Sequence, residues 1–258
     1  MKSILIQLFF LSTLLLSCTS TSEESLGGNE TINVVNNRQA TGSSANDFLS
    51  NNNFKKIIVE FAYIEGYKPT ETAKNNFKDF IESRVFKSSG IEFIEKEIPT
   101  TGKIEYTLDE IVNIEKEHRT KYNTNSTIAL WVLFVNGKSS NDTNSSSILG
   151  SAYWNTSFVI YEETIRELSN SAFEPERSLL ETSVINHEFG HILGLTNLGS
   201  DLQSNHEDPN HPKHCIEENC LMFWAAETSQ GIGNMLSGGQ VPNLDAQCLA
   251  DLRANGGK

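Results

Sequence analysis

One stretch in the second half of the chain decides the fold. Residues 183–195 read Ser-Val-Ile-Asn-His-Glu-Phe-Gly-His-Ile-Leu-Gly-Leu. Apolar residues recur around this stretch at helical spacing and predict a helix over residues 178–195, with Gly194 near its end. His187 and His191 are four residues apart, so on a helix their imidazoles point to the same side.

The two histidines and the adjacent acid suit metal chemistry. Neutral imidazole is a good zinc ligand. A bound zinc lowers the pKa of a water molecule, and a neighbouring carboxylate can take the proton as that water attacks. We therefore predict that His187 and His191 are zinc ligands and that Glu188 is the general base of a zinc hydrolase.

The identity of a third zinc ligand is open at this level. A catalytic zinc usually has three protein ligands and one open position. Three histidines in the polar segment after the helix are candidates: His206, His211 and His214. Histidines in such a segment, which also contains Pro209 and Pro212, are often only surface residues.

Two motifs carry a resemblance to a known family. Residues 187–194 read His-Glu-Phe-Gly-His-Ile-Leu-Gly and resemble the metzincin clan, although the position where that clan has its next ligand is Asn197. Residues 214–222 read His-Cys-Ile-Glu-Glu-Asn-Cys-Leu-Met and resemble the archaemetzincin signature. This resemblance implies that His214 is the third zinc ligand and that Met222 belongs to the Met-turn beneath the metal.

The resemblance also implies a fold and an activity. The expected fold is α+β and zincin-like, with a twisted mixed sheet, an active-site helix and a short C-terminal subdomain from about Thr196. The edge strand of such a sheet binds extended peptide by strand addition, and residues 150–152 are the candidate edge. The expected activity is that of a zinc endopeptidase acting on proteins or peptides. Two rivals are a zinc-containing surface lipoprotein that does not cleave and a zinc hydrolase of non-peptide substrates.

The region before the catalytic helix predicts alternating strands and helices. Expected strands cover residues 57–63, 91–98 and 127–135, and the last of these is apolar enough for a central strand covered on both faces. Expected helices cover residues 70–87 and 107–118. With the catalytic helix, these elements predict a single metallopeptidase domain over residues 51–258.

The N-terminus predicts export. Lys2 precedes an apolar run, Ile4–Leu16, that is too short to span a membrane and ends at Ser17-Cys18. This pattern resembles a bacterial lipoprotein processing site, which implies a signal peptide over residues 1–17 and lipidation of Cys18. We expect a disordered linker over residues 18–50 and a lipid-anchored protein on the outer membrane or cell surface. The whole chain resembles membrane metalloprotease lipoproteins of Bacteroidetes-type bacteria.

The cysteines predict one disulfide bond and bear on the number of metal ions. With Cys18 lipidated, three cysteines remain in an oxidising compartment, and one disulfide plus one free thiol is the simplest count. Cys215 and Cys220 are the candidate pair, with Cys248 as an alternative partner for either. Archaemetzincins have a later Cys-x-x-Cys pair for a second zinc, where this chain has only Cys248, so we expect one ion.

The net charge of −13 argues against nucleic acid as a partner.

Overall fold

The computed structural model describes residues 24–26, 30–172 and 174–258. The expected signal peptide and Cys18 lie outside these residues. Before the catalytic helix, the chain forms β1 (Glu24–Leu26), β2 (Glu30–Ile32), η1 (Val34–Asn37), α1 (Ala45–Leu49), β3 (Lys56–Ile64), α2 (Glu71–Arg84), β4 (Ile91–Ile98), β5 (Glu105–Tyr106), α3 (Leu108–His118), β6 (Thr127–Phe134), β7 (Lys138–Ser139), β8 (Gly150–Trp154), β9 (Ser157–Ile160) and α4 (Glu162–Glu167). The helix that carries His187 and the C-terminal part of the chain form α5 (Arg177–Ile192), η2 (Trp224–Glu227), α6 (Ile232–Met235) and α7 (Ala246–Ala254).

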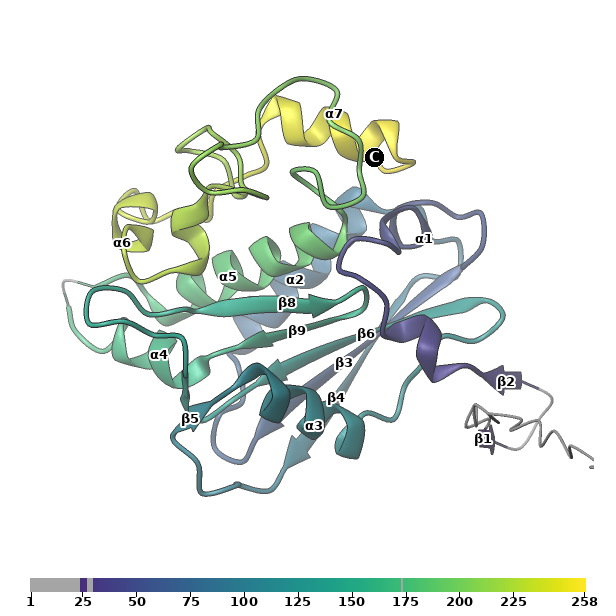
Figure 1. Ribbon diagram of the computed structural model, residues 1–258, viewed down its shortest axis with the longest axis horizontal. Helices are drawn as coiled ribbons and strands as arrows, with labels where there is room; N and C mark the ends of the chain where they lie inside the picture. The colour runs from purple at the N-terminus through teal and green to yellow at the C-terminus, as the bar shows by residue number, and fades with distance from the viewer. Residues whose placement is uncertain (1–23, 27–29, 173) are drawn as a thin grey trace, which may run out of the picture.

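A five-stranded mixed sheet forms the centre of the molecule (Figure 1). Its order is β4-β3-β6-β9-β8, and all neighbours are parallel except β8, which runs antiparallel to β9. Strand β6 lies in the middle and is buried at every position after Thr127. Burial on both faces explains its unbroken apolar sequence.

Helices cover both faces of the sheet. Helices α2 and α5 pack on one face, where Phe77 stacks on Phe61 of β3 and contacts Phe189 of α5 edge to face. Helix α3 covers the other face through Ile111 and Ile114. A threonine caps each of α2 and α3 at the first residue of the expected range: Thr70 accepts from the N–H of Ala73, and Thr107 forms a capping box.

The structure corrects the last part of the linker expected over residues 18–50, and residues 18–23 and 27–29 of that range lie outside the described residues. Residues 33–50 form a segment, here called the strap, that includes η1 and α1. Phe48 and Leu49 are fully buried in the main core, and Phe48 contacts Phe189 of α5 edge to face. The folded domain therefore begins before residue 51, because two large apolar side chains hold the strap against α5.

The chain after α5 forms a part without long strands that lies beyond the free edge of β8 (Figure 1). Gly194, in the left-handed region with φ 74°, ends the helix and redirects the chain. No helix among the described residues has the length and apolarity needed to cross a membrane.

Candidate metal centre

Two turns of α5 supply the centre. His187 and Glu188 are fully buried and His191 is 5% exposed, so this end of the helix lies beneath other segments. The Nε2 atoms of His187 and His191 are 3.1 Å apart, which shows that the two imidazoles converge as their spacing predicts. The α5 helix is therefore the element that brings the predicted pair together.

His214 completes a group of three imidazoles. Its ring centroid lies 5.3 Å from that of His187 and 5.2 Å from that of His191. His206 and His211 lie elsewhere: His206 is buried against Asp251 at 2.7 Å, and His211 stacks on Trp224. Asn197 does not approach the group, because its amide donates to Glu207.

Backbone carbonyls set the tautomer of two of these rings. Nδ1 of His187 lies 2.7 Å from the carbonyl oxygen of Leu221, and Nδ1 of His214 lies 3.1 Å from that of Pro212. Each Nδ1 must carry the proton to donate, so each Nε2 keeps its lone pair for the centre of the group. This arrangement is typical of metal-binding histidines.

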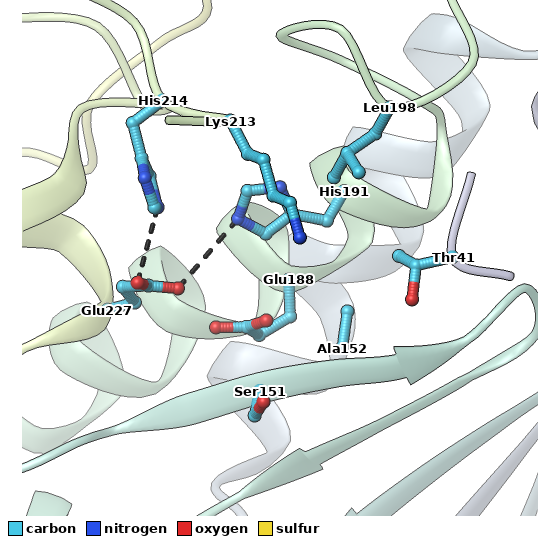
Figure 2. Close-up of a pocket in the computed structure, with 9 residues that line it drawn as sticks. All are labelled: Thr41, Ser151, Ala152, Glu188, His191, Leu198, Lys213, His214 and Glu227. Atoms are coloured by element: carbon cyan, nitrogen blue, oxygen red, sulfur yellow. Dashed lines mark ion pairs between the residues drawn. The ribbon is translucent and has the colours of Figure 1, made fainter. Parts of the chain in front are cut away.

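Glu227 is a carboxylate beside the three imidazoles that the sequence did not single out. Its carboxylate lies 3.2 Å from Nε2 of His214 and 3.6 Å from Nε2 of His187. Figure 2 shows it between His214 and His191, on the opposite side of Glu188 from Thr41. One ligand atom from each of the three histidines and from Glu227 lies within 4.8 Å of the others. No motif predicts Glu227, because the segment after Met222 must fold back onto α5 to place it there.

The titratable groups in the centre are strongly affected by burial. Burial lowers the pKa of His191 to about 4, which keeps this imidazole neutral as a metal ligand must be. Burial, with a further contribution from Glu227, raises the pKa of Glu188 well above its usual range. Burial alone would raise the pKa of Glu227, but its contacts with the three histidines bring it well below the usual value.

The residues fit a zinc ion. Both carboxylate oxygens of Glu188 are buried without a hydrogen-bond partner, and Nε2 of His214 faces the Glu227 carboxylate, which has no proton to donate to it. Buried polar atoms are costly unless something satisfies them. An ion held by three neutral imidazoles would use Nε2 of His214, and a water molecule beside it would satisfy Glu188.

Close packing holds the surrounding elements against the centre. A Cβ on Gly190 would lie 2.3 Å from Sδ of Met222, so the methionine packs directly on this glycine of α5. A Cβ on Gly150 would lie 2.7 Å from Cγ of Glu188, so strand β8 passes equally close to the proposed base. Met222 thus lies against the helix that carries His187 and His191.

The expected disulfide is not formed. Cys215, Cys220 and Cys248 are all free thiols, so the prediction of a Cys215–Cys220 bond is corrected. These three cysteines and Asp245 bring their ligand atoms within 4.8 Å of one another. Three sulfurs and a carboxylate are a donor set that can hold a zinc ion as a closed four-coordinate site.

A buried pair supports this second cluster. Nδ1 of His206 lies 3.5 Å from Sγ of Cys215, while its Nε2 faces Asp251 at 2.7 Å. Hydrogen bonds from the thiols of Cys215 and Cys248 lower the pKa of Cys220, while the same contacts raise the pKa of Cys248, so one thiolate is shared among the three sulfurs. Asp245 was not predicted, because the resemblance implied a Cys-x-x-Cys pair and the chain has only Cys248 in this region.

Comparison with known proteins supports the fold. No protein-family profile matches the sequence, and no curated protein matches it significantly. The structure is similar to the crystal structure of archaemetzincin (amzA) from Methanopyrus kandleri, with a TM-score of 0.51 and 14% sequence identity. The match covers 78% of this chain and 96% of that chain. At this identity the likeness shows a shared mixed α/β fold with a mostly parallel sheet.

Proposed function

We propose that this protein is a zinc-dependent peptidase. The observation that carries the proposal is the convergence of the His187, His191 and His214 Nε2 atoms beside the unpartnered carboxylate of Glu188. A zinc site that only binds the ion, or a structural zinc site with four protein ligands, does not need a free carboxylate beside the ion. The similarity to archaemetzincin supports the same conclusion.

The residues of the site have distinct tasks in this proposal. The three histidines would hold zinc, which when bound acidifies water and polarises the carbonyl to be attacked. Glu188 takes the proton released as the water attacks and passes it to the leaving amine. The position of Glu188 suits this role, because both of its carboxylate oxygens are buried without a protein partner and can therefore bond to a water molecule at the metal. The backbone of β8 lies beside Glu188 and can align an extended peptide by strand addition.

The test is peptide hydrolysis by the purified domain with and without zinc. We expect cleavage of peptides in a mixture of different lengths, its loss after complete metal removal, and its recovery on adding zinc. Activity that survives complete zinc removal would contradict the proposal. Zinc binding without cleavage of any peptide would favour a binding lipoprotein, and cleavage confined to esters or other non-peptide bonds would favour a different hydrolase.

We also propose a second bound zinc, at the cluster formed by Cys215, Cys220, Asp245 and Cys248. The free thiols and the supporting His206–Asp251 pair favour this over the single ion expected from the sequence. Metal analysis should give about two ions per chain, and Cys248→Ala should lower this to about one. A Cys248→Ala variant with unchanged metal content would contradict the second site.

For location, we propose that the chain is a lipoprotein anchored through Cys18 on the outer membrane or cell surface. The support is the apolar run that ends directly before this cysteine. Labelling of cells with a fatty-acid analogue should mark the natural chain and leave Cys18→Ser unmarked. Label retained by the serine variant would show that the chain is not lipidated at this position.

A further inference from the structure

The cavity at the metal centre is small. It has a volume of about 210 Å³ and is lined by Thr41, Ser151, Ala152, Glu188, His191, Leu198, Lys213, His214 and Glu227. Pockets that hold drug-sized ligands measure roughly 300–1,000 Å³. Figure 2 shows Thr41 and Leu198 on one side of Glu188, and Glu227 on the other. The segments that carry these residues decide how far a substrate can extend.

One end of the cleft is closed by strand pairing. The chain just before β8 pairs with the segment after η2 through an antiparallel bridge between Ile148 and Thr228. The N–H of Leu149 donates to the carbonyl of Glu227 at 2.8 Å, and the N–H of Ser229 donates to the carbonyl of Ser147 at 2.8 Å. A substrate strand added to β8 cannot continue past Gly150 in register, because residues 227–229 already occupy that edge.

The strap closes the other end. Asn155, directly after β8, is 1% exposed and bonds to the strap with its side chain. Its amide donates to the carbonyl of Asn36 and to the hydroxyl of Ser44, both at 2.8 Å, and its Oδ1 accepts from the N–H of Gln39 at 2.9 Å. The strap is thus fastened to the sheet beside Trp154, the last residue of β8.

The strap also reaches the opposite wall of the cleft. Gly42, with φ 80°, packs so closely on the loop after α5 that an added Cβ would lie 1.8 Å from the carbonyl oxygen of Leu198. A Cβ on Gly199 would lie 2.5 Å from the carbonyl oxygen of Gly42. The neighbouring Thr41 lines the cavity. The strap therefore joins both walls and leaves no straight path for a peptide beyond this point.

Between the two closures, the edge of β8 extends over only five residues, Gly150–Trp154. Five residues of strand span about 17 Å at about 3.3 Å each. We propose that the substrates are short peptides, on the order of five residues or fewer, rather than segments of long chains. This inference rests on the proposed peptidase function and names its substrate class.

Lys213 gives a short peptide a charge to bind. Its backbone is in the left-handed region with φ 72°, held there by its N–H to Glu207 at 2.8 Å and by the hydroxyl of Thr196 on its carbonyl. This turn directs the side chain into the cavity, as Figure 2 shows. Within the described part of the chain no carboxylate pairs with its ammonium group. We infer that Lys213 binds a carboxylate of the substrate.

The test for length is a set of peptides that share one scissile bond and grow from three to twelve residues. We expect kcat/KM to be highest at about five residues or fewer and to fall by roughly tenfold or more at twelve, because the closures clash with a longer chain. Equal rates for short and long peptides, with zinc-dependent cleavage of both, would overturn this inference alone. Cleavage of no peptide at any length would overturn the proposed function as well.

Variants that remove strap contacts test whether the strap is what limits the length of the peptide. Asn155→Ala and the milder Ser44→Ala remove strap contacts, and Asn76→Ala, whose amide bonds to Thr182 between α2 and α5, is the matched control. The strap variants should raise the ratio of twelve-residue to short-peptide cleavage, and the control should leave it unchanged. A ratio that stays constant in a folded, zinc-loaded Ser44→Ala or Asn155→Ala protein would argue that the strap does not limit length.

The test for Lys213 compares free-acid with amidated peptides, and peptides containing Glu with those containing Gln. The first comparison detects binding of the terminal carboxylate, and the second detects binding of a side chain. Lys213→Met should lose about tenfold more kcat/KM on the preferred acid than on its neutral counterpart, the loss expected for one hydrogen bond to a charged group. Lys213→Arg should recover part of this preference. Equal loss on acid and neutral peptides in both comparisons would overturn the role of Lys213.

Discussion

Glu188 is the residue on which the chemistry depends. Replacing it with Gln keeps the size of the side chain but removes its ability to take a proton. We expect Glu188→Gln to bind zinc normally and to lose turnover by roughly 10²–10⁴-fold, the usual contribution of general acid–base catalysis. Metal analysis and single-peptide kinetics on the same preparation would check this. A nearly normal rate would place the base elsewhere.

His214 is the residue for which sequence and structure now make the sharpest prediction. His214→Ala should weaken zinc binding at the catalytic centre much more than the roughly 10–100-fold caused by losing an outer-shell partner. His211→Ala serves as the matched control, because this histidine stacks on Trp224 and belongs to neither cluster. Competitive zinc titration compares the two variants. Normal affinity in His214→Ala together with a loss in His211→Ala would reverse the assignment.

At the residue scale, the sequence predicts the helical ligands and leaves the rest open. His187, Glu188 and His191 follow from spacing on one helix, which is a local property. Glu227 and Asp245 reach their clusters only through long-range folding of the C-terminal part, and acidic residues are too common to stand out in a sequence. The third ligand became a specific expectation only through the motif that starts at His214.

Helix α5 has no room for a larger side chain at Gly190, where it packs against Met222. Gly190→Ala should destabilise the protein by about 1–3 kcal/mol, because the new methyl group overlaps with Sδ of Met222 and the helix or the turn must shift. Gly233→Ala is the matched control, since a Cβ there meets nothing within 4 Å in α6. Chemical denaturation measures both variants. Equal stability of the two would contradict close packing of Met222 on α5.

Most elements could be predicted because their patterns are local. Strand β4 has the bounds expected from the sequence, and the threonine caps place the starts of α2 and α3. The errors lie at helix ends: Phe86, inside the helix expected over residues 70–87, follows the end of α2 and is 48% exposed. Leu108 is 44% exposed in the first turn of α3. Apolar periodicity does not reveal which end of a helix extends beyond the sheet.

On the scale of the whole molecule, the strap decides where the domain begins. Composition predicted a linker up to residue 50, because residues 33–50 contain few large apolar side chains. Two of these few, Phe48 and Leu49, are fully buried. The side chain of Asn155 also bonds to the backbone of the strap. Burial of two side chains and a set of backbone contacts can order a polar segment. These contacts join residues far apart in the sequence, so no local pattern predicts them.

Truncation tests this boundary. Removing residues 1–50 should destabilise the domain strongly, because loss of a single buried Phe or Leu side chain costs about 2–5 kcal/mol. Removing residues 1–32 is the matched control and keeps the whole strap. Thermal unfolding of the two truncated proteins gives the comparison. Equal melting temperatures would show that the strap contributes nothing to folding.

The central claim is that His187, His191 and His214 hold the catalytic zinc in this fold. Anomalous diffraction at the zinc absorption edge, from crystals of the zinc-loaded protein, tests it most directly. We predict a peak bound by the Nε2 atoms of these three histidines, with Glu188 beside it but not bound to it. A zinc-saturated crystal without a peak at this cluster, or with a peak bound by His206 or His211 in place of His214, would contradict the claim.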